Sequence, residues 1–249
     1  MKVGSKGGSR HLKRLAAPRS WSIRRKEKKF VEKPSPGPHP IASSVTLGHL
    51  LTSTFRYCKT SKEARKVLRD GLVRVDGQVR RKTDFPIGLM DVVEFPTLGE
   101  AYRIFVGTKQ RLFPVKIGVE EKSFKLCRIE NKKTVRGGRV SYMLHDGRTC
   151  IVREGQEVFA RGWSLKIGLP EGDLQGHVPL REGAVAGAIA GKNCGRWGVI
   201  EGIVPQTEGA ESLVRIRAFQ GGDYLAPLRY VFVVGDSKPW IKLPTGASG

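Results

Sequence analysis

The first regular pattern of apolar positions lies in residues 45–69 and predicts two helices. Apolar side chains recur with a helical period through residues 45–55. Thr60 followed three residues later by Glu63 is typical of a capping box, so a second helix should begin there. Gly71 is suited to end that helix, because glycine readily adopts the conformation that follows a last helical turn.

The predicted second helix separates apolar from basic side chains. Ala64, Val67 and Leu68 fall on one face. The other face carries four cations, Lys62, Arg65, Lys66 and Arg69. A charged face of this kind is most often only a solvated surface, so its interpretation depends on the segments that follow.

From residue 73 onward the apolar pattern changes to strands. Residues 73–80 alternate across an Asp76-Gly77 turn and predict a hairpin. Further strands are predicted at 88–95, 102–106, 113–117, 124–129, 140–144 and 149–152, with a second hairpin turn at Asp146-Gly147. The expected fold class is therefore mainly β with a small α+β module, in several domains.

Two glycine-rich segments carry basic residues. Residues 131–139 form a basic segment that is either an exposed turn or a binding loop, and charge alone does not distinguish the two. Residues 183–204 fail as a phosphate loop, because Gly187 lies too close to Gly191-Lys192 and Asn193 replaces the required Ser or Thr. The apolar run in this segment is too short for a helix that crosses a membrane.

What remains for residues 183–204 is a pair of strands joined by a tight turn. This arrangement is similar to the KOW motif of SH3-like barrels in ribosomal proteins and transcription elongation factors, where glycines allow close backbone approach. The exposed candidates for RNA contact in this turn are Lys192, Asn193 and Arg196.

Composition adds a strong charge constraint. The 249 residues contain 45 Lys and Arg against 23 Asp and Glu, a net charge of +22, and 39% of residues are hydrophobic. The apolar share favours several small cores over one large one. An excess of positive charge this large favours a polyanionic partner, and nucleic acid is the first candidate.

The N-terminal segment holds nearly half of that charge. Residues 1–33 contain twelve Lys and Arg against two Glu, interleaved with aliphatic and aromatic side chains. We expect it to thread between RNA helices, with cations on phosphates and Trp21 against a base or in a protein pocket. The candidate RNA contacts here are Lys6, Arg10, His11, Lys13, Arg14, Arg19, Trp21, Arg24, Arg25 and Lys26.

No pattern points to catalysis, a metal or a cofactor. His145-Asp146 lacks a recognisable nucleophile or third orienting group, and a turn is the expected role. The four cysteines are scattered without Cys-x-x-Cys spacing and are expected to be free thiols. We expect a cytoplasmic protein that is not an enzyme and binds no small-molecule substrate, because neither a secretory signal nor a spanning segment is found.

The early module resembles a known RNA-binding domain. Two short helices followed by "VRVDGQV" and "GLMDVVEF" are similar to the module shared by bacterial ribosomal protein S-four, some pseudouridine synthases and tyrosyl-tRNA synthetases. In that family the second helix and the adjoining loop face RNA. The resemblance implies RNA contact at Lys62, Arg65, Lys66, Arg69, Arg74, Arg80, Arg81 and Lys82.

The whole chain resembles the S-four-e family of small-subunit ribosomal proteins of archaea and eukaryotes. The motifs are "HLKRLAAPRSW" at 11–21, "GPHP" at 37–40, "GLMDVVEF" at 88–95, "KLCRI" at 125–129, "HDGRT" at 145–149 and "KPWIKLP" at 238–244. The length and the absence of a long charged tail favour an archaeal member. The resemblance implies a structural constituent of the small ribosomal subunit whose partners are small-subunit rRNA and neighbouring ribosomal proteins.

The expected organisation has five parts: a basic extension (1–40), an S-four-like RNA-binding domain (41–105), a central β domain (106–178), a KOW SH3-like barrel (179–235) and a C-terminal tail (236–249). An RNA-modifying enzyme would also use the early module, but it needs a catalytic domain that the residues after 105 do not indicate. A transcription elongation factor would explain the KOW motif but not the module before it.

Overall fold

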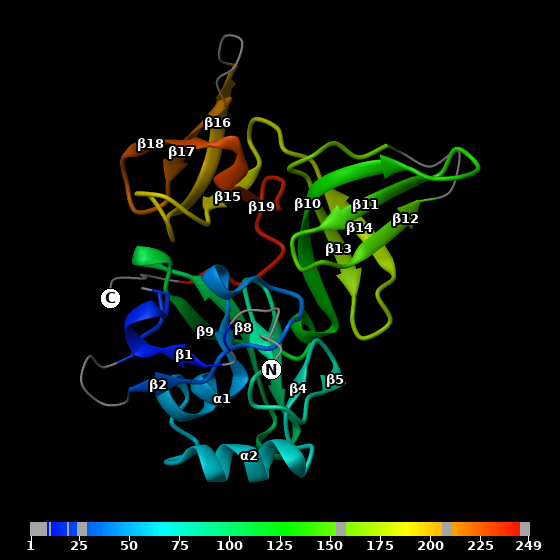
Figure 1. Cartoon of the computed structure of the whole chain (residues 1–249). Coiled ribbons are helices and arrows are strands. Elements are labelled where there is room, and N and C mark those ends of the chain that lie inside the picture. The colour runs from blue at the N-terminus through cyan, green and yellow to red at the C-terminus, as the bar shows by residue number, and fades with distance from the viewer. Residues whose placement is uncertain are drawn as a thin grey trace, which may run out of the picture.

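The computed structural model describes residues 9, 11–18, 20–23, 29–152, 158–205 and 211–244. Within these residues the regular structure is mainly antiparallel β, in three five-stranded sheets and two short strand pairs, with two α-helices near the N-terminal end (Figure 1). The predicted fold class, mainly β with a small α+β module, is confirmed.

The two predicted helices form with altered boundaries. β3 (Val45–Thr46) pairs with β6 (Pro86–Ile87), so helical structure begins only at α1 (Leu47–His49) and continues as a π-helical turn over Leu50–Thr54. The prediction of a helix from residue 45 is therefore wrong at its first turn, because the β-branched pair Val45 and Thr46 is held in a strand.

α2 (Ser61–Arg69) begins and ends as predicted. The Thr60 hydroxyl accepts a hydrogen bond from the Glu63 N–H at 3.2 Å, and the Glu63 carboxylate accepts one from the Lys59 N–H at 2.8 Å. The box thus reaches one residue further back than the usual pattern. Gly71 follows the helix with φ of +76°.

The first sheet has the order β5 (Gln78–Val79), β4 (Arg74–Val75), β7 (Val92–Phe95), β8 (Glu100–Val106) and β9 (Leu112–Ile117). The predicted hairpin is confirmed, with positive φ at both Asp76 and Gly77 as a type I′ turn requires. The expected domain boundary at residue 105 falls inside β8, and the sheet continues through β9.

The central sheet has the order β12 (Thr149–Val152), β11 (Val140–Leu144), β10 (Phe124–Thr134), β13 (Ser164–Gly168) and β14 (Leu174–Val178). β10 extends five residues beyond its predicted end, since β11 pairs with it through Thr134. Only residues 135–139 of the predicted basic loop remain outside a strand.

The C-terminal sheet has the order β18 (Asp223–Pro227), β17 (Leu213–Ala218), β16 (Trp197–Val204), β15 (Val185–Ala188) and β19 (Val231–Gly235). Its glycines serve close strand packing. A Cβ on Gly187 would lie 2.4 Å from the Trp197 ring, and one on Gly198 would lie 1.9 Å from the Arg217 carbonyl oxygen.

The three sheets share one apolar cluster. It combines side chains of the first sheet and its flanks, the start of β10 and the C-terminal sheet, among them Met90, Phe105, Leu126, Trp197 and Phe232. Ile241 and Trp240, in the expected C-terminal tail, also pack there. The sheets are therefore fixed against one another by a common core.

A buried ionic cluster, the Lys125 junction, joins the first and central sheets. Lys125 on β10 has no exposed surface, and its Nζ lies 3.0 Å from Asp76 Oδ2, 2.5 Å from Asp91 Oδ1 and 3.1 Å from Asp146 Oδ2. Asp76 belongs to the β4–β5 turn, Asp91 precedes β7, and Asp146 lies in the β11–β12 turn. One ammonium group therefore connects three separate turns and loops.

Two further side chains complete the Lys125 junction. Arg148 lies 2.7 Å from Asp76 and 3.2 Å from Asp146, and His39 from the segment before the first module lies 3.0 Å from Asp91. Burial opposes the charged form of Asp91, but the Lys125 ammonium and the His39 ring hold its pKa well below the usual range.

The same ionic environment acts on Asp146 and Lys125. Burial opposes ionisation of Asp146, and Lys125, His145 and Arg148 outweigh it and lower the pKa of Asp146 to about 2. Burial would lower the pKa of Lys125, whereas Asp76 and Asp91 raise it well above its usual range. Lys125, Asp91 and Asp146 are therefore ionised over the whole neutral pH range.

Removal of the Lys125 ammonium should strongly destabilise the fold. Lys125→Met leaves three neighbouring carboxylates with Arg148 and His39 as their remaining partners, so we expect the free energy of unfolding to fall by about 3–5 kcal/mol. Chemical denaturation measures it. Lys133→Met, at the exposed end of the same strand, is the matched control and should change stability by less than about 0.5 kcal/mol; equal effects in the two variants would contradict the junction's importance.

The pH dependence of stability should report on His145. Burial, followed by the Lys125 ammonium, lowers the pKa of His145 from 6.5 to about 4. In the unfolded chain His145 takes up a proton near pH 6.5, whereas in the folded chain it does so only near pH 4. The free energy of unfolding should therefore fall as the pH is lowered between these two values. His145→Gln should flatten the dependence in this window, whereas His11→Gln should preserve it. An unchanged pH profile in the His145 variant would refute this assignment.

Candidate nucleic-acid interface

The outer face of α2 presents the predicted basic side chains. Lys62, Arg65, Lys66 and Arg69 are all exposed, whereas Ala64 and Leu68 on the opposite face are buried. The spacing of three and four residues places the four cations on one side of the helix. α2 runs along the lower edge of the molecule in Figure 1.

The residues after the hairpin extend this basic face. Arg81 Nη1 donates a hydrogen bond to the Arg69 carbonyl at 3.0 Å and so joins the hairpin exit to the end of α2. Arg80 is half-buried with its guanidinium 4.4 Å from the centre of the Phe85 ring, and it donates to Gln78 at 2.9 Å. The exposed set, here called the α2 surface, consists of Lys62, Arg65, Lys66, Arg69, Arg74, Arg81 and Lys82.

The α2 surface is electrostatically uncompensated. Among the described residues, no carboxylate oxygen lies within 4.0 Å of any cationic nitrogen of the α2 surface. Exposed ion pairs are found at other places in the molecule, as at Lys116–Glu100 and Arg181–Asp236. Exposed Glu63 and Asp70 lie on α2 and at its end but form no ion pair with these cations, so seven cations remain unpaired and repel one another. Such a surface is suited to a polyanion.

The N-terminal extension is only partly described. Lys6, Arg10, Arg19, Arg24, Arg25 and Lys26 lie outside the described residues. His11 and Lys13 are exposed, and Arg14 is half-buried with Nη2 donating to the Ile23 carbonyl at 2.6 Å. The segment folds back on itself through a short pairing of β1 (Leu12–Lys13) with β2 (Phe30–Val31).

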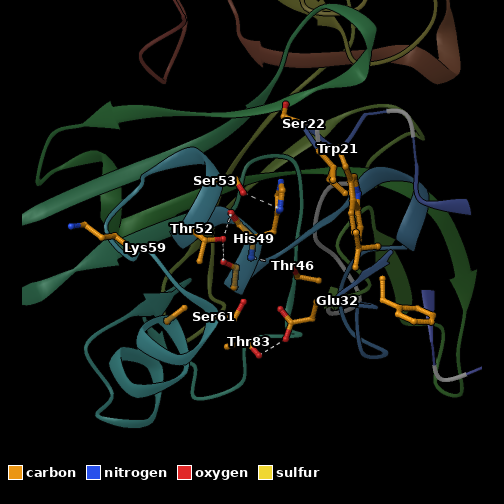
Figure 2. Close-up of a pocket in the computed structure, with 15 residues that line it drawn as sticks. Trp21, Ser22, Glu32, Thr46, His49, Thr52, Ser53, Lys59, Ser61 and Thr83 are labelled. Carbon is orange, nitrogen blue, oxygen red and sulfur yellow. Dashed lines mark hydrogen bonds between the residues drawn. The ribbon is translucent and has the colours of Figure 1, made fainter. Parts of the chain in front are cut away.

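Trp21 anchors this extension to the first module (Figure 2). It is 6% exposed, its indole N–H donates to the Ser44 carbonyl at 2.6 Å, and its ring lies 6.2 Å from the His49 ring in a stacked arrangement. Of the two predicted positions, a base or a protein pocket, the structure has Trp21 in a pocket of its own chain. We therefore remove Trp21 from the candidate RNA contacts.

The cavity beside Trp21 is lined by polar side chains of both the extension and the first module. Its volume is about 240 Å³, and its lining includes Glu32, Thr46, His49 and Thr83. Glu32 accepts a hydrogen bond from the Thr83 hydroxyl, and Thr46 accepts one from the His49 N–H at 3.3 Å (Figure 2). The geometry fits an attachment point between extension and module.

The predicted contacts in the 189–196 turn have different environments. Lys192 is exposed. Asn193 donates to the Leu225 carbonyl at 3.2 Å, and Arg196 donates to the Gly221 carbonyl at 3.0 Å while its guanidinium covers the Tyr224 ring. Asn193 and Arg196 thus stabilise the C-terminal sheet. Of these three residues, Lys192 alone remains a candidate for contact with RNA.

One group of side chains has the residue types of a metal site. Cys127, His145 and Asp146 place a ligand atom each within 4.8 Å of one another. His145 Nδ1 accepts the Arg128 N–H at 3.2 Å and Nε2 donates to the Leu89 carbonyl at 3.2 Å, so neither nitrogen has a free lone pair. Burial raises the pKa of Cys127 well above its usual value and keeps it a thiol. The donor chemistry does not fit a metal ion.

The cysteines and helices add no other chemistry. Cys58, Cys127 and Cys194 are buried, Cys150 is half-buried, and all four are free thiols as predicted. Within the described residues, no helix has both the length and the apolar character needed to cross a membrane.

Three family models match successive parts of this chain. The RS4NT (NUC023) domain matches residues 6–42, the S4 domain matches residues 54–93, and Ribosomal family S4e matches residues 98–174. The S4 match contains α2 and the hairpin that form the α2 surface.

Relatives are similar over nearly the full length. "Small ribosomal subunit protein eS4" of Ignicoccus hospitalis is 44% identical over 249 residues, covering 97% of both chains. The protein of the same name from Desulfurococcus amylolyticus is 42% identical over 251 residues, covering 98% of this chain and all of the relative. The crystal structure of the 30S ribosomal protein S4e from Thermoplasma acidophilum matches with a TM-score of 0.66 and 30% identity, over 78% of this chain and 96% of that one. With this agreement in sequence, domain content and structure, the chain belongs to the S4e family of ribosomal proteins.

Proposed function

We propose that this chain is a structural constituent of the small ribosomal subunit that binds and stabilises small-subunit rRNA. The observation that carries the proposal is the α2 surface, a set of seven exposed cations without a described carboxylate partner, inside a matched S4 domain. Membership of the S4e family supports the same function. Neighbouring ribosomal proteins are the second class of partner, and the site of action is the cytoplasmic small subunit.

The mechanism is electrostatic attachment to folded RNA. Lys and Arg on the α2 surface neutralise phosphates and release bound counterions, which supplies affinity without reading sequence. RNA shape then determines where the cations meet phosphates, since double-stranded RNA hides its base edges in a deep groove. Lys13 and Lys192 are further exposed cations that this mechanism can use, and His11 is exposed as well.

A rigid body makes this attachment more effective. The Lys125 junction and the shared apolar cluster fix the three sheets before RNA is bound. Binding then costs little conformational entropy within the protein. RNA helices that touch different parts of the chain are held in one relative arrangement.

Neutralising the α2 surface should weaken rRNA binding and its salt dependence together. If the wild type neutralises about 8–10 phosphates, the slope of log affinity against log salt is about −6 to −9. Arg65→Gln, Lys66→Gln and Arg69→Gln combined should reduce that slope by about 2–3 and the affinity at least about tenfold, as measured by filter binding to small-subunit rRNA.

The matched control removes three cations that are already paired. Lys116→Gln, Arg181→Gln and Arg217→Gln combined change the net charge equally, but each cation has a carboxylate neighbour. This variant should bind nearly as the wild type does. Equal losses in both variants would mean that net charge, and not the α2 surface, controls binding, and a wild-type slope near −1 would contradict phosphate attachment.

Sedimentation separates the proposal from an RNA-modifying enzyme or a transcription elongation factor. The chain should migrate with small subunits in a gradient and stay with them through a high-salt wash, because many contacts must break together. An enzyme would wash off, and an elongation factor would migrate with RNA polymerase. Either of those two distributions would overturn the ribosomal assignment.

A further inference from the structure

The outer half of β10 and the turn after it form a basic projection, here called the ribbon, with cations at Lys132, Lys133, Arg136 and Arg139. The first six residues of β10 are buried, whereas residues 131–134 are exposed. All four cations are exposed as well. β10 therefore belongs to the core in its first half and lies in solvent in its second.

The ribbon has a defined backbone. Lys132 pairs with Tyr142 and Lys133 with Ser141 across the β10–β11 ladder, and the Val135 N–H donates to the Arg139 carbonyl at 2.8 Å. Gly137 and Gly138 have φ of +81° and +69°, which closes the turn. A Cβ on Gly137 would meet no atom within 4 Å, so the tip is surrounded by open space.

Within the described residues, no ion pair involves the cations of the ribbon, and Arg139 Nε donates only to the Arg136 carbonyl at 3.4 Å. Residues 131–139 contain four cations and no acid. In the described part of the chain, none of the four has a carboxylate oxygen within 4.0 Å, and the adjacent acid, Glu130, is bound by Arg128 at 2.9 Å. Like charges held close together cost free energy, and all four side chains are exposed. Their arrangement fits an external anion.

Strand geometry distributes the cations over both faces of the ribbon. Successive side chains of a strand point to opposite faces, so Lys132 lies on the face of Tyr142 and Lys133 on the other, with Ser141. Arg136 and Arg139 flank the two glycines at the tip. A protein that packed against the sheet would meet one face, whereas two phosphate backbones on either side would meet both.

We propose that the ribbon inserts between two phosphate backbones of rRNA and is a second RNA-binding surface, separate from the α2 surface. The inference rests on the proposed function and adds to it a location and a geometry. β10, β11 and β12 extend to the right of the molecule in Figure 1, whereas α2 lies at the bottom. Lys125, seven residues before Lys132 on the same strand, ties the ribbon's base to the first sheet.

The test removes the ribbon's charges and leaves its fold intact. Lys132→Gln, Lys133→Gln, Arg136→Gln and Arg139→Gln combined should lower the salt slope of small-subunit rRNA binding by about 3–4 and the affinity by about 100-fold. The control with equal charge change is Lys116→Gln, Arg181→Gln, Arg217→Gln and Arg229→Gln, whose cations all have acidic partners. It should change the slope by less than about 1, and thermal unfolding confirms that both variants fold.

The single variants test insertion. Lys132→Gln and Lys133→Gln should each weaken binding about threefold or more, since they lie on opposite faces; an effect from one lysine alone would overturn insertion between two backbones.

The outcomes distinguish the ribbon from the general function. A wild type that binds rRNA with a slope near −1 would overturn both proposals. The wild type and the α2-surface variant could bind rRNA as expected while the ribbon variant binds with the same slope and affinity as its four-substitution control. That outcome would overturn the ribbon proposal alone. A ribbon variant that binds free rRNA normally but fails to enter reconstituted small subunits would assign the ribbon to a protein neighbour and would also overturn it.

Discussion

The ammonium group of Lys125 lies where no water reaches it, and three carboxylates from separate turns surround it. A buried charge without partners costs several kcal/mol, so the interior tolerates Lys125 only when the β4–β5 turn, the start of β7 and the β11–β12 turn all converge on it. Folding of the first and central sheets is therefore conditional on their relative position. Arg128 extends the connection to the C-terminal sheet by donating to the Val231 carbonyl at 3.0 Å.

This constraint explains how a chain with a net charge of +22 holds a single shape. Asp76, Asp91 and Asp146 are directed inward to Lys125, whereas no described carboxylate forms an ion pair with the cations of the α2 surface or the ribbon. Positive surfaces facing different directions then belong to one rigid body. Such a body can hold separate RNA segments in a fixed arrangement and gains affinity from each phosphate that it neutralises.

Much of the fold follows from local sequence rules, and the junction does not. The capping box at Thr60 and the Asp76-Gly77 turn are local, so spacing and residue type were enough to predict them. Lys125 and Asp91 look like ordinary polar positions within "KLCRI" and "GLMDVVEF". A charge inside an apolar strand was the available signal, but the carboxylate partners of Lys125 are 21 to 49 residues away along the chain. The choice between a base and a protein pocket for Trp21 was open for the same reason, since Ser44 and His49 approach it only in the folded chain. The α2 surface was predictable because helical spacing alone separates its two faces.

The density of an assembled small subunit is the most direct measurement of the central claim, that one rigid body presents its unpaired cations to rRNA. The account predicts rRNA phosphates within about 4 Å of side chains on the α2 surface and of the ribbon, with the Lys125 junction closed and free of nucleotides. A subunit in which α2 and the ribbon face solvent or protein, or in which the first and central sheets separate at Lys125 on assembly, would contradict it.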